Sequence, residues 1–344
     1  MLRATARIDT GAIERNCARL AALAPLCAVV KANGYGHGAV ESARAAQRGG
    51  ASSLAVATAN EAAQLRAAGI GGPILVMGAL SPTELEIALA ARADVVAWRE
   101  EFLSGLSGDV GVHVKLDTGM GRLGTRDPEE ATRVAEAVKA RGLRLAGGMT
   151  HFATADDDPA FMREQLNRFL AWEIDAPRHA ANSAAALAEP AARLDMIRCG
   201  IAIYGMDPFH NDPADHGLEP ALRLVSYVAE VKRAQPGESV GYGRRFVAER
   251  ATWIGTIPIG YGDGFRRGLT NRFEAVVGER RVKGIGTVSM DNVTVDLGDT
   301  PVERGTEAVL IGSGSLAEDL ARTLDTINYE ITCGISARVP RVYE

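Results

Sequence analysis

The sequence predicts an α/β barrel followed by a mostly β domain, and two observations support this expectation. From about residue 27 to residue 205, short apolar runs alternate with helical stretches. Eight such units in succession favour a closed parallel barrel of the (β/α)8, TIM-like type over a doubly wound open sheet. After about Glu219 the helices mostly stop, and strands divided by glycine, proline and asparagine turns follow. We expect the barrel domain over residues 1–220, of which about the first nine could join the β domain, and the β-rich domain over residues 221–344.

The expected barrel strands are short apolar segments. They cover residues 27–31, 54–57, 74–78, 94–98, 110–117, 144–152, 178–182 and 195–204. Helical stretches of 8 to 15 residues separate them. Two helix starts are well marked, because Ser81 precedes Pro82 and Asp127 precedes Pro128, a capping residue just before a proline at the first helical position.

The sequence of the C-terminal third predicts mainly antiparallel strands. They are expected at residues 222–234, 252–259, 273–277, 283–288, 293–297 and 307–311. Only residues 316–324 have helical character in this region.

Composition narrows the class of protein. The 344 residues are 47% hydrophobic and 24% charged, which excludes global disorder. The formal charge of −5 argues against nucleic acid as the main partner. No apolar run approaches the roughly 18 residues of a membrane span, and the first residues lack the apolar core of a signal peptide. The four cysteines show no CxxC spacing, so we expect reduced thiols, no metal site and a cytoplasmic enzyme.

Chemically useful side chains stand where the expected barrel strands end, which is where barrel enzymes build their active sites. These side chains are Lys31, Met77, Trp98, Lys115 with Asp117, His151, Asn182 and Arg198.

The most informative segment is residues 27–38, where a buried strand ends in Lys31 and a loop with three glycines, Tyr35 and His37 follows. A partly desolvated lysine can have a lowered pKa and react with an aldehyde cofactor to form a Schiff base. The alternative is a lysine that extends from the barrel mouth into water.

Residues 28–38, AVVKANGYGHG, resemble the pyridoxal-phosphate signature of the alanine racemase family. The resemblance covers essentially the full chain in family order, through residues 113–124, 151–156, 179–183, 198–201, 240–243, 259–264 and 289–291. It implies a barrel joined to a β domain and a homodimer with shared active sites. It also implies interconversion of L-alanine and D-alanine through lysine-bound pyridoxal 5'-phosphate, which supplies D-alanine for peptidoglycan.

The resemblance assigns two opposed acid/bases, which suits inversion of a stereocentre through a carbanion. Lys31 should hold the cofactor and act on one face of the substrate, and Tyr242 from the partner subunit on the other. A tyrosine ordinarily titrates near pH 10, so Tyr242 needs positive charge nearby. His151 should lie next to Tyr242 and Arg198. The alternative for Tyr242 is a buried tyrosine of the β domain.

Arg198 should face the pyridine nitrogen of the cofactor and make its ring a weaker electron sink. By the same resemblance, His179 orients Arg198. A salt bridge at the barrel rim is the alternative for this arginine.

The cofactor's phosphate is expected at the loops after barrel strands seven and eight, where helix N-termini and glycine amides suit a dianion. Asn182, Ser183, Gly200 and Ile201 stand there, and the resemblance adds Tyr35 as a hydroxyl donor. The alternative for Ser183 is a plain helix cap.

Lys115 and Arg122 are two cations expected at one barrel mouth. The resemblance implies that Lys115 is carbamylated and fixes Arg122, which contacts the cofactor's phenolic oxygen and the substrate. An ordinary pair between Lys115 and Asp117 is the alternative.

The resemblance also places three residues of the β domain at the partner's substrate entrance. They are Tyr261, Met290 and Asp291. The alternative for Met290 is a core residue.

The sequence departs from the family pattern at Ala337, where many members carry a tyrosine that donates to the phosphate. Gly241 and Ser289 are further, small departures. They leave the substrate range open. Four alternatives remain: a broader racemase for serine or lysine, a fold-related decarboxylase with a thiol opposite the lysine, a pyridoxal-phosphate carrier, and a structural barrel.

Overall fold

The computed structural model describes residues 2–344. The chain divides into two compact units. One is Gly11–Glu219, and the other joins the N-terminal residues up to Thr10 with Pro220–Glu344. The N-terminal strand β1 (Thr5–Ile8) therefore belongs to the C-terminal β unit, where it pairs with β10 (Leu222–Tyr227) and β19 (Arg341–Tyr343).

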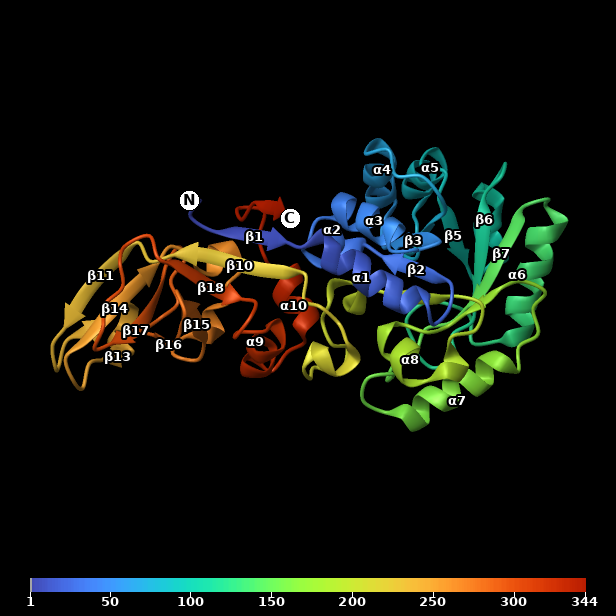
Figure 1. The fold of residues 1–344 in the computed structure, drawn as a ribbon. Coiled ribbons are helices and arrows are strands. Elements are labelled where there is room, and N and C mark those ends of the chain that lie inside the picture. The colour runs from blue at the N-terminus through green and yellow to red at the C-terminus, as the bar shows by residue number, and fades with distance from the viewer. Residues whose placement is uncertain (1) are drawn as a thin grey trace. The chain divides into compact units, whose positions relative to one another are not determined.

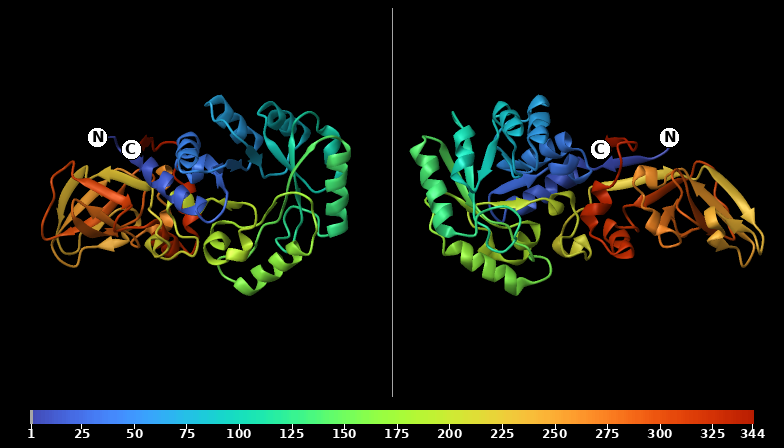
Figure 2. Two further views of the ribbon diagram at one scale, coloured as in Figure 1. Left: turned by 45° about the vertical axis from the view of Figure 1, so that its right-hand side comes forward. Right: turned by 180° about the vertical axis from the view of Figure 1, so that it is seen from behind.

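The first unit is a parallel eight-stranded barrel with helices on its outside (Figures 1 and 2), as predicted. Its strands follow one another in the order of the chain until the last, which pairs with the first. They are β2 (Leu26–Val29), β3 (Ser53–Val56), β4 (Ile74–Val76), β5 (Asp94–Ala97), β6 (Gly111–Lys115), β7 (Arg144–Met149), β8 (Arg178–His179) and β9 (Ile197–Cys199).

Backbone contacts beyond the regular strand pairs bring β8 and β9 together. The Arg198 N–H donates to Ala181 O at 2.9 Å, and the Asp195 N–H donates to Arg178 O at 3.0 Å. These bonds place the residues after β8 beside β9, so the sheet nearly closes on itself. The open-sheet alternative is therefore wrong.

The helices of this unit mostly begin where the sequence marks a cap. Ser81 caps α5 through the Glu84 N–H, and Asp127 caps α6 through the Glu129 N–H. The α-helices are α1 (Thr10–Ala21), α2 (Lys31–Tyr35), α3 (Ala39–Arg48), α4 (Ala59–Ala67), α5 (Pro82–Ala90), α6 (Pro128–Ala140), α7 (Pro159–Leu170) and α8 (Ser183–Ala188).

Two connections are shorter than expected. The link from β5 to β6 contains only the 3-10 helix η1 (Glu100–Gly105), and α8 has six residues, so helices of 8 to 15 residues do not separate all the strands. Ser104 and two glycines, Gly105 and Gly108, follow the start of η1 and favour turns over a longer helix.

The second unit is a nine-stranded, mainly antiparallel sheet. Besides β1, β10 and β19 it contains β11 (Glu230–Ala234), β14 (Thr252–Ile257), β15 (Glu274–Val277), β16 (Arg280–Ile285), β17 (Val293–Gly298) and β18 (Glu307–Ile311). The short strands β12 (Ser239–Val240) and β13 (Phe246–Val247) form a separate pair.

Two expectations for this unit were wrong. The segment 222–234 is two strands, because the chain changes its pairing partner from β18 to β14 between β10 and β11, where Val228 N bonds to Thr306 O and Ala229 N to Thr256 O. A second helix, α10 (Asn328–Cys333), follows the predicted α9 (Ala317–Leu324). It lacks the side-chain cap that would have marked it. No helix among residues 2–344 has the length and hydropathy that crossing a membrane requires.

Candidate active site

Lys31 stands at the carboxyl end of β2, at the start of an unusual turn. Residues 32–35 all have positive φ values, of 52°, 52°, 61° and 52°. They form a left-handed turn, which is unfavourable for residues other than glycine. The turn buries Tyr35 and leaves Lys31 half-buried. A backbone bond from Gly34 N to Val30 O, 3.0 Å, and one from Gly36 N to Ala32 O, 3.1 Å, close it.

The buried hydroxyls of Tyr35 and Ser183 meet the backbone that follows β9. A Cβ on Gly200 would lie 2.3 Å from the Tyr35 hydroxyl, so only glycine permits this approach. Ser183 Oγ accepts the N–H groups of Gly200, at 3.1 Å, and Ala202, at 3.3 Å. Ile201 begins the buried 3-10 helix η3 (Ile201–Tyr204). The predicted phosphate-site residues therefore come together.

Asn182, and not Ser183, caps helix α8. Its side-chain oxygen accepts the Ala185 N–H at 3.0 Å. The alternative in which Ser183 is the helix cap is therefore wrong, because its hydroxyl faces the β9 loop.

Arg198 is a buried cation at 3% exposure, held by neutral groups. Its Nη2 donates to Thr150 O at 2.7 Å and to Ala180 O at 3.1 Å, and lies 3.3 Å from His151 Nδ1. Its Nη1 lies 2.8 Å from His179 Nδ1. Within residues 2–344, no carboxylate lies within ion-pair distance of Arg198, which contradicts the alternative of a salt bridge at the rim. Burial lowers the pKa of Arg198 to about 10, so the guanidinium remains charged at neutral pH.

A line of side chains runs through the barrel interior from Arg198. His179 Nε2 lies 2.8 Å from His113 Nδ1, and His113 Nε2 lies 3.7 Å from Asp94 Oδ2. Because Arg198 can only donate, His179 must accept at Nδ1 and carry its proton on Nε2. His113 then accepts at Nδ1 and presents Nε2–H to Asp94. Every donor thus points away from Arg198.

Gly147 on β7 makes room for this line. A Cβ there would lie 2.9 Å from His113 Nδ1 and 3.2 Å from His179 Nε2. Burial opposes ionisation of Asp94, but its contacts with His113 and Arg144 hold its pKa below the ordinary value. The predicted orienting role of His179 matches this geometry, whereas Asp94 and His113 were missed as parts of the line. The two-residue spacing of His113 and Lys115 would have shown that both face the same side of β6.

The neighbouring histidines remain neutral. Burial, followed by the charge of Arg198, holds the pKa of both His151 and His179 well below the usual range. The charges of Lys115, Arg122 and Lys31 also lower the pKa of His151.

Lys115 is the buried last residue of β6. Burial, and then the charges of Arg198 and Arg122, lower its pKa to about 8, although Asp117 acts in the opposite sense. The Asp117 carboxylate accepts the N–H groups of Gly119, Met120 and Gly121 within 3.1 Å. The simple pair of Lys115 with Asp117 is therefore not favoured. Arg122 is exposed in the loop that these bonds shape.

The remaining predicted residues belong to the C-terminal unit, on loops joined by one segment. Thr287 Oγ1 donates to Tyr242 O at 2.6 Å, Tyr261 N to Ser289 O at 3.0 Å, and Gly262 N to Met290 O at 2.9 Å. Tyr242 is 76% exposed, Tyr261 41% and Met290 51%. The alternatives of a buried Tyr242 and a core Met290 are wrong.

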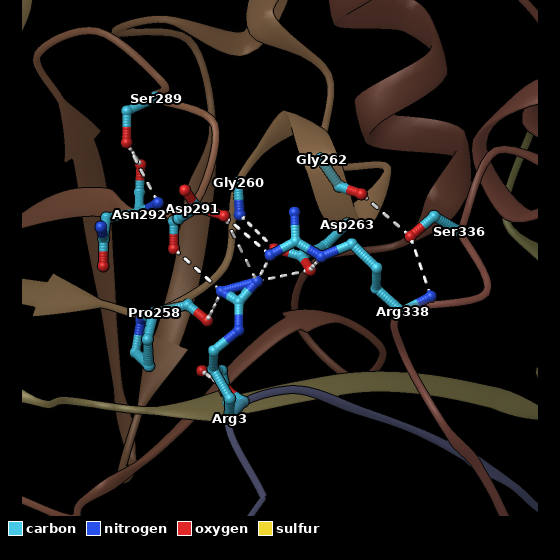
Figure 3. Close-up of polar contacts among 11 residues, drawn as sticks. Arg3, Pro258, Gly260, Gly262, Asp263, Ser289, Asp291, Asn292, Ser336 and Arg338 are labelled. Carbon is cyan, nitrogen blue, oxygen red and sulfur yellow. Dashed lines mark hydrogen bonds and ion pairs between the residues drawn. The ribbon is translucent and has the colours of Figure 1, made fainter.

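Two arginines and two aspartates hold the Tyr261 and Met290 loops (Figure 3). The buried Asp263 accepts two bonds of 2.6 Å from Arg3 and lies 3.5 Å from Arg338 Nε. Asp291 Oδ1 pairs with Arg338 Nη2 at 2.7 Å. Asp263 also accepts the Gly260 N–H at 2.9 Å. Among the described residues, no cluster of histidine, cysteine or acidic side chains is arranged to hold a metal.

Comparison with known proteins agrees with this geometry. A family model described as "Alanine racemase, N-terminal domain" matches residues 8–208, and one described as "Alanine racemase, C-terminal domain" matches residues 221–343. The chain belongs to the alanine racemase family.

Members of the family from several bacteria are similar over nearly the full chain. The alanine racemase of Geobacillus stearothermophilus is 41% identical, over 98% of this chain and 92% of the relative. That of Thermobifida fusca is 42% identical, over 99% and 98%. The crystal structure of alanine racemase from E. faecalis superposes with a TM-score of 0.94 at 38% identity, covering 99% of this chain and 98% of that one. The predicted family and fold are thus confirmed, and the decarboxylase, carrier and structural-barrel alternatives are not favoured.

Proposed function

We propose that this chain interconverts L-alanine and D-alanine in the cytoplasm, as a homodimer that uses pyridoxal phosphate and supplies D-alanine for peptidoglycan. The observation that carries the proposal is the meeting of Tyr35, Ser183 and the Gly200 backbone at the end of β9, the strand that also carries the buried and uncompensated Arg198. Such a cationic site suits a substrate with a carboxylate and a cofactor with a phosphate.

The residues at this end of the barrel fit pyridoxal phosphate. The close approach of Tyr35 to Gly200 forms a cradle that a side chain would fill. The cradle adjoins the Ser183 hydroxyl. Tyr35, Asn182, Ser183 and the backbone of Gly200 and Ile201 would hold the phosphate, and Lys31 would hold the cofactor covalently. When bound, the cofactor ring delocalises the negative charge left when Cα loses its proton.

Arg198 would face the ring nitrogen, oriented by His179. A guanidinium that stays charged can donate a hydrogen bond to the ring nitrogen but cannot accept one from it. Its charge therefore disfavours a protonated ring. We expect the ring to be a moderate electron sink, which limits decarboxylation and transamination as side reactions.

Lys31 and Tyr242 would move the proton. In the direction from L- to D-alanine, one of them takes the Cα proton and the other delivers a proton to the opposite face; in the reverse direction the roles exchange. The atoms concerned are Lys31 Nζ and the Tyr242 hydroxyl. The neutral His151 would accept a hydrogen bond from the Tyr242 hydroxyl and so orient it.

Tyr242 would act in the site of the partner subunit. Tyr242, Tyr261 and Met290 are all exposed, on loops that one segment of the C-terminal unit connects, so they are available to a partner subunit. In the dimer, Tyr261, Met290 and Asp291 would line the substrate entrance, and Arg122 would contact the alanine carboxylate.

Lys115 would carry a carbamate. A pKa of about 8 leaves part of its amine uncharged near neutral pH, and this amine can attack carbon dioxide at carbon. A C–N bond forms as one C=O π bond of carbon dioxide opens to an oxyanion, and the nitrogen releases one proton to water. The side chain then carries a carbamate anion in place of an ammonium cation and can fix Arg122. Native mass spectrometry should show the added mass of one carbon dioxide, which Lys115→Met removes; an unchanged mass under saturating bicarbonate would contradict this.

The direct test is proton exchange in heavy water. With pyridoxal phosphate and L-alanine, the protein should produce D-alanine labelled with deuterium at Cα. Lys31→Ala should abolish the product, whereas Lys139→Ala, which removes an exposed lysine paired with Asp175, should not. Serine and lysine should be tested alongside alanine, because Ala337 lacks the hydroxyl common in the family. Bound cofactor without exchange of alanine would overturn the proposal.

A further inference from the structure

The left-handed turn that follows Lys31 needs support from outside its own segment. Ala32 and Tyr35 adopt a left-handed backbone conformation that costs energy for a residue with a Cβ, whereas Asn33 and Gly34 accept it more readily. Such a conformation persists only where the surroundings hold it in place.

The carboxylate of Glu61 supplies one such hold. Its Oε1 accepts the Ala32 N–H at 2.6 Å, directly after Lys31 in the chain. Its Oε2 accepts the N–H groups of Ala57, at 2.8 Å, and Thr58, at 3.1 Å, at the end of β3 and the start of α4. A single side chain therefore connects the backbone beside Lys31 to the next barrel unit.

The next peptide group of the turn is also held. Ala32 O accepts the Gly36 N–H at 3.1 Å. Farther along the turn, Asn33 Oδ1 accepts the Ala39 N–H at 3.1 Å, at the start of α3. Of these contacts, the one from Glu61 lies nearest to Lys31 in the chain.

The neighbouring helix offers a comparison. Helices α4 and α5 each have nine residues and begin with the same reciprocal cap, Thr58 with Glu61 and Ser81 with Glu84. Glu84 accepts from Ser81 N at 2.9 Å and Ser81 Oγ at 2.8 Å, both within its own cap. Glu61 makes the equivalent cap and, in addition, reaches Ala32. The cap alone does not require this contact.

We propose that Glu61 is a positioning residue that fixes the direction of the Lys31 side chain by clamping the left-handed turn at Ala32. This inference rests on the proposed role of Lys31 as the acid/base and cofactor-bearing residue. Glutamine in place of Glu61 has one acceptor oxygen and turns an NH2 donor toward an N–H group, so it can serve Ala32 or the α4 cap but not both.

The experiment compares Glu61→Gln and Glu61→Ala with Glu84→Gln and Glu84→Ala. The first readout is amide hydrogen exchange over residues 31–38 in the cofactor-free protein, which does not depend on activity. Exchange there should accelerate about tenfold or more in the Glu61 variants, as expected when the local opening becomes easier. The Glu84 variants should leave it unchanged.

The second readout separates positioning from general stability. The Glu61 variants should lower kcat about 10- to 100-fold, with KM for alanine changed little, because a misplaced reactive group costs rate. They should also weaken binding of pyridoxal phosphate, titrated into the apoprotein. Thr58→Ala loses the hydroxyl half of the cap but keeps the carboxylate, so it should behave like the Glu84 variants.

Equal effects of the Glu61 and Glu84 variants would overturn the clamp, as would unchanged exchange over residues 31–38. Faster exchange with unchanged kcat and cofactor affinity would overturn its role in positioning Lys31. If the unaltered protein does not racemise alanine, the proposed function fails, while the exchange comparison still decides whether Glu61 holds the turn. Should Glu61→Ala not fold, Glu61→Gln carries the test.

Discussion

The two units treat the charge of structurally important arginines in opposite ways. In the barrel, Arg198 is held by carbonyl oxygens and neutral histidines. In the C-terminal unit, Arg3 and Arg338 are neutralised by Asp263 and Asp291. The first arrangement orients a cation without cancelling its charge, whereas the second uses opposite charges to hold loops. A charge that is to act on a bound group must remain uncompensated, and a charge that only holds structure need not.

The largest expected effect is at Arg198. Arg198→Gln should destabilise the barrel by about 3 kcal/mol, because Thr150 O, Ala180 O and His179 lose a buried donor. Urea unfolding measures this loss. Arg198→Lys, which keeps the charge and one or two of the bonds, should cost less. An equal or greater loss would show that the fixed orientation of the guanidinium donors, and not the retained charge, decides the stability.

Asp263 should give the next largest effect. Asp263→Asn removes the charge shared by Arg3 and Arg338 but leaves an acceptor for Gly260 N. We expect a loss of about 2 kcal/mol, because both guanidiniums are more than a third exposed and remain solvated. Asp291→Asn, at a carboxylate that is 50% exposed, is the control and should cost under about 1 kcal/mol. An equal loss of unfolding free energy in Asp263→Asn and Asp291→Asn would show that burial of the carboxylate does not matter here.

The pH dependence of stability sharpens the comparison for the barrel. His179 has a folded pKa below its unfolded value of about 6.5, so the unfolded chain binds more protons between the two values. Its contribution is therefore fully present above about pH 6.5 and is lost as the pH falls, by up to about 1.4 kcal/mol per pH unit. Urea unfolding at pH values from about 7.5 to about 5, on either side of the ordinary histidine pKa, gives the free energy of unfolding against pH. This plot should have a shallower slope for His179→Gln than for the unaltered protein. Identical slopes in both proteins would contradict a neutral His179.

The smallest effect is expected for a pair in which neither partner is fully buried, unlike Asp263 at 2% exposure. Arg7 and Glu307, 2.7 Å apart and about a third exposed, should couple by under about 1 kcal/mol in a double-mutant cycle. Added salt should reduce this coupling further. A coupling as large as that of Arg3 with Asp263 would mean that burial does not decide the strength of these pairs.

The barrel and the β unit could be predicted from the sequence because apolar runs, caps and turn residues are local signals. The two caps at Ser81 and Asp127 are examples, and both were found at the expected residues. The short link through η1 was missed although Ser104, Gly105 and Gly108 favour turns there, and the helix α10 was missed because it has no side-chain cap.

The site could be predicted only in part. Motifs indicated Lys31, Arg198 and Tyr242, but their roles stay proposals. The line from Arg198 to Asp94 joins residues from four strands, and its passage depends on Gly147, where the useful property is a missing side chain. The left-handed turn after Lys31 depends on a glutamate 29 positions away, a distance that no local pattern reveals.

The measurement that tests the account most directly mixes two inactive chains. Lys31→Ala and Tyr242→Phe homodimers should each lack racemase activity. Heterodimers formed by refolding the two together contain one site with both residues intact, so activity should return to about half of the unaltered level per heterodimer. Confirmed heterodimers without activity would contradict a site that is completed by Tyr242 of the partner subunit.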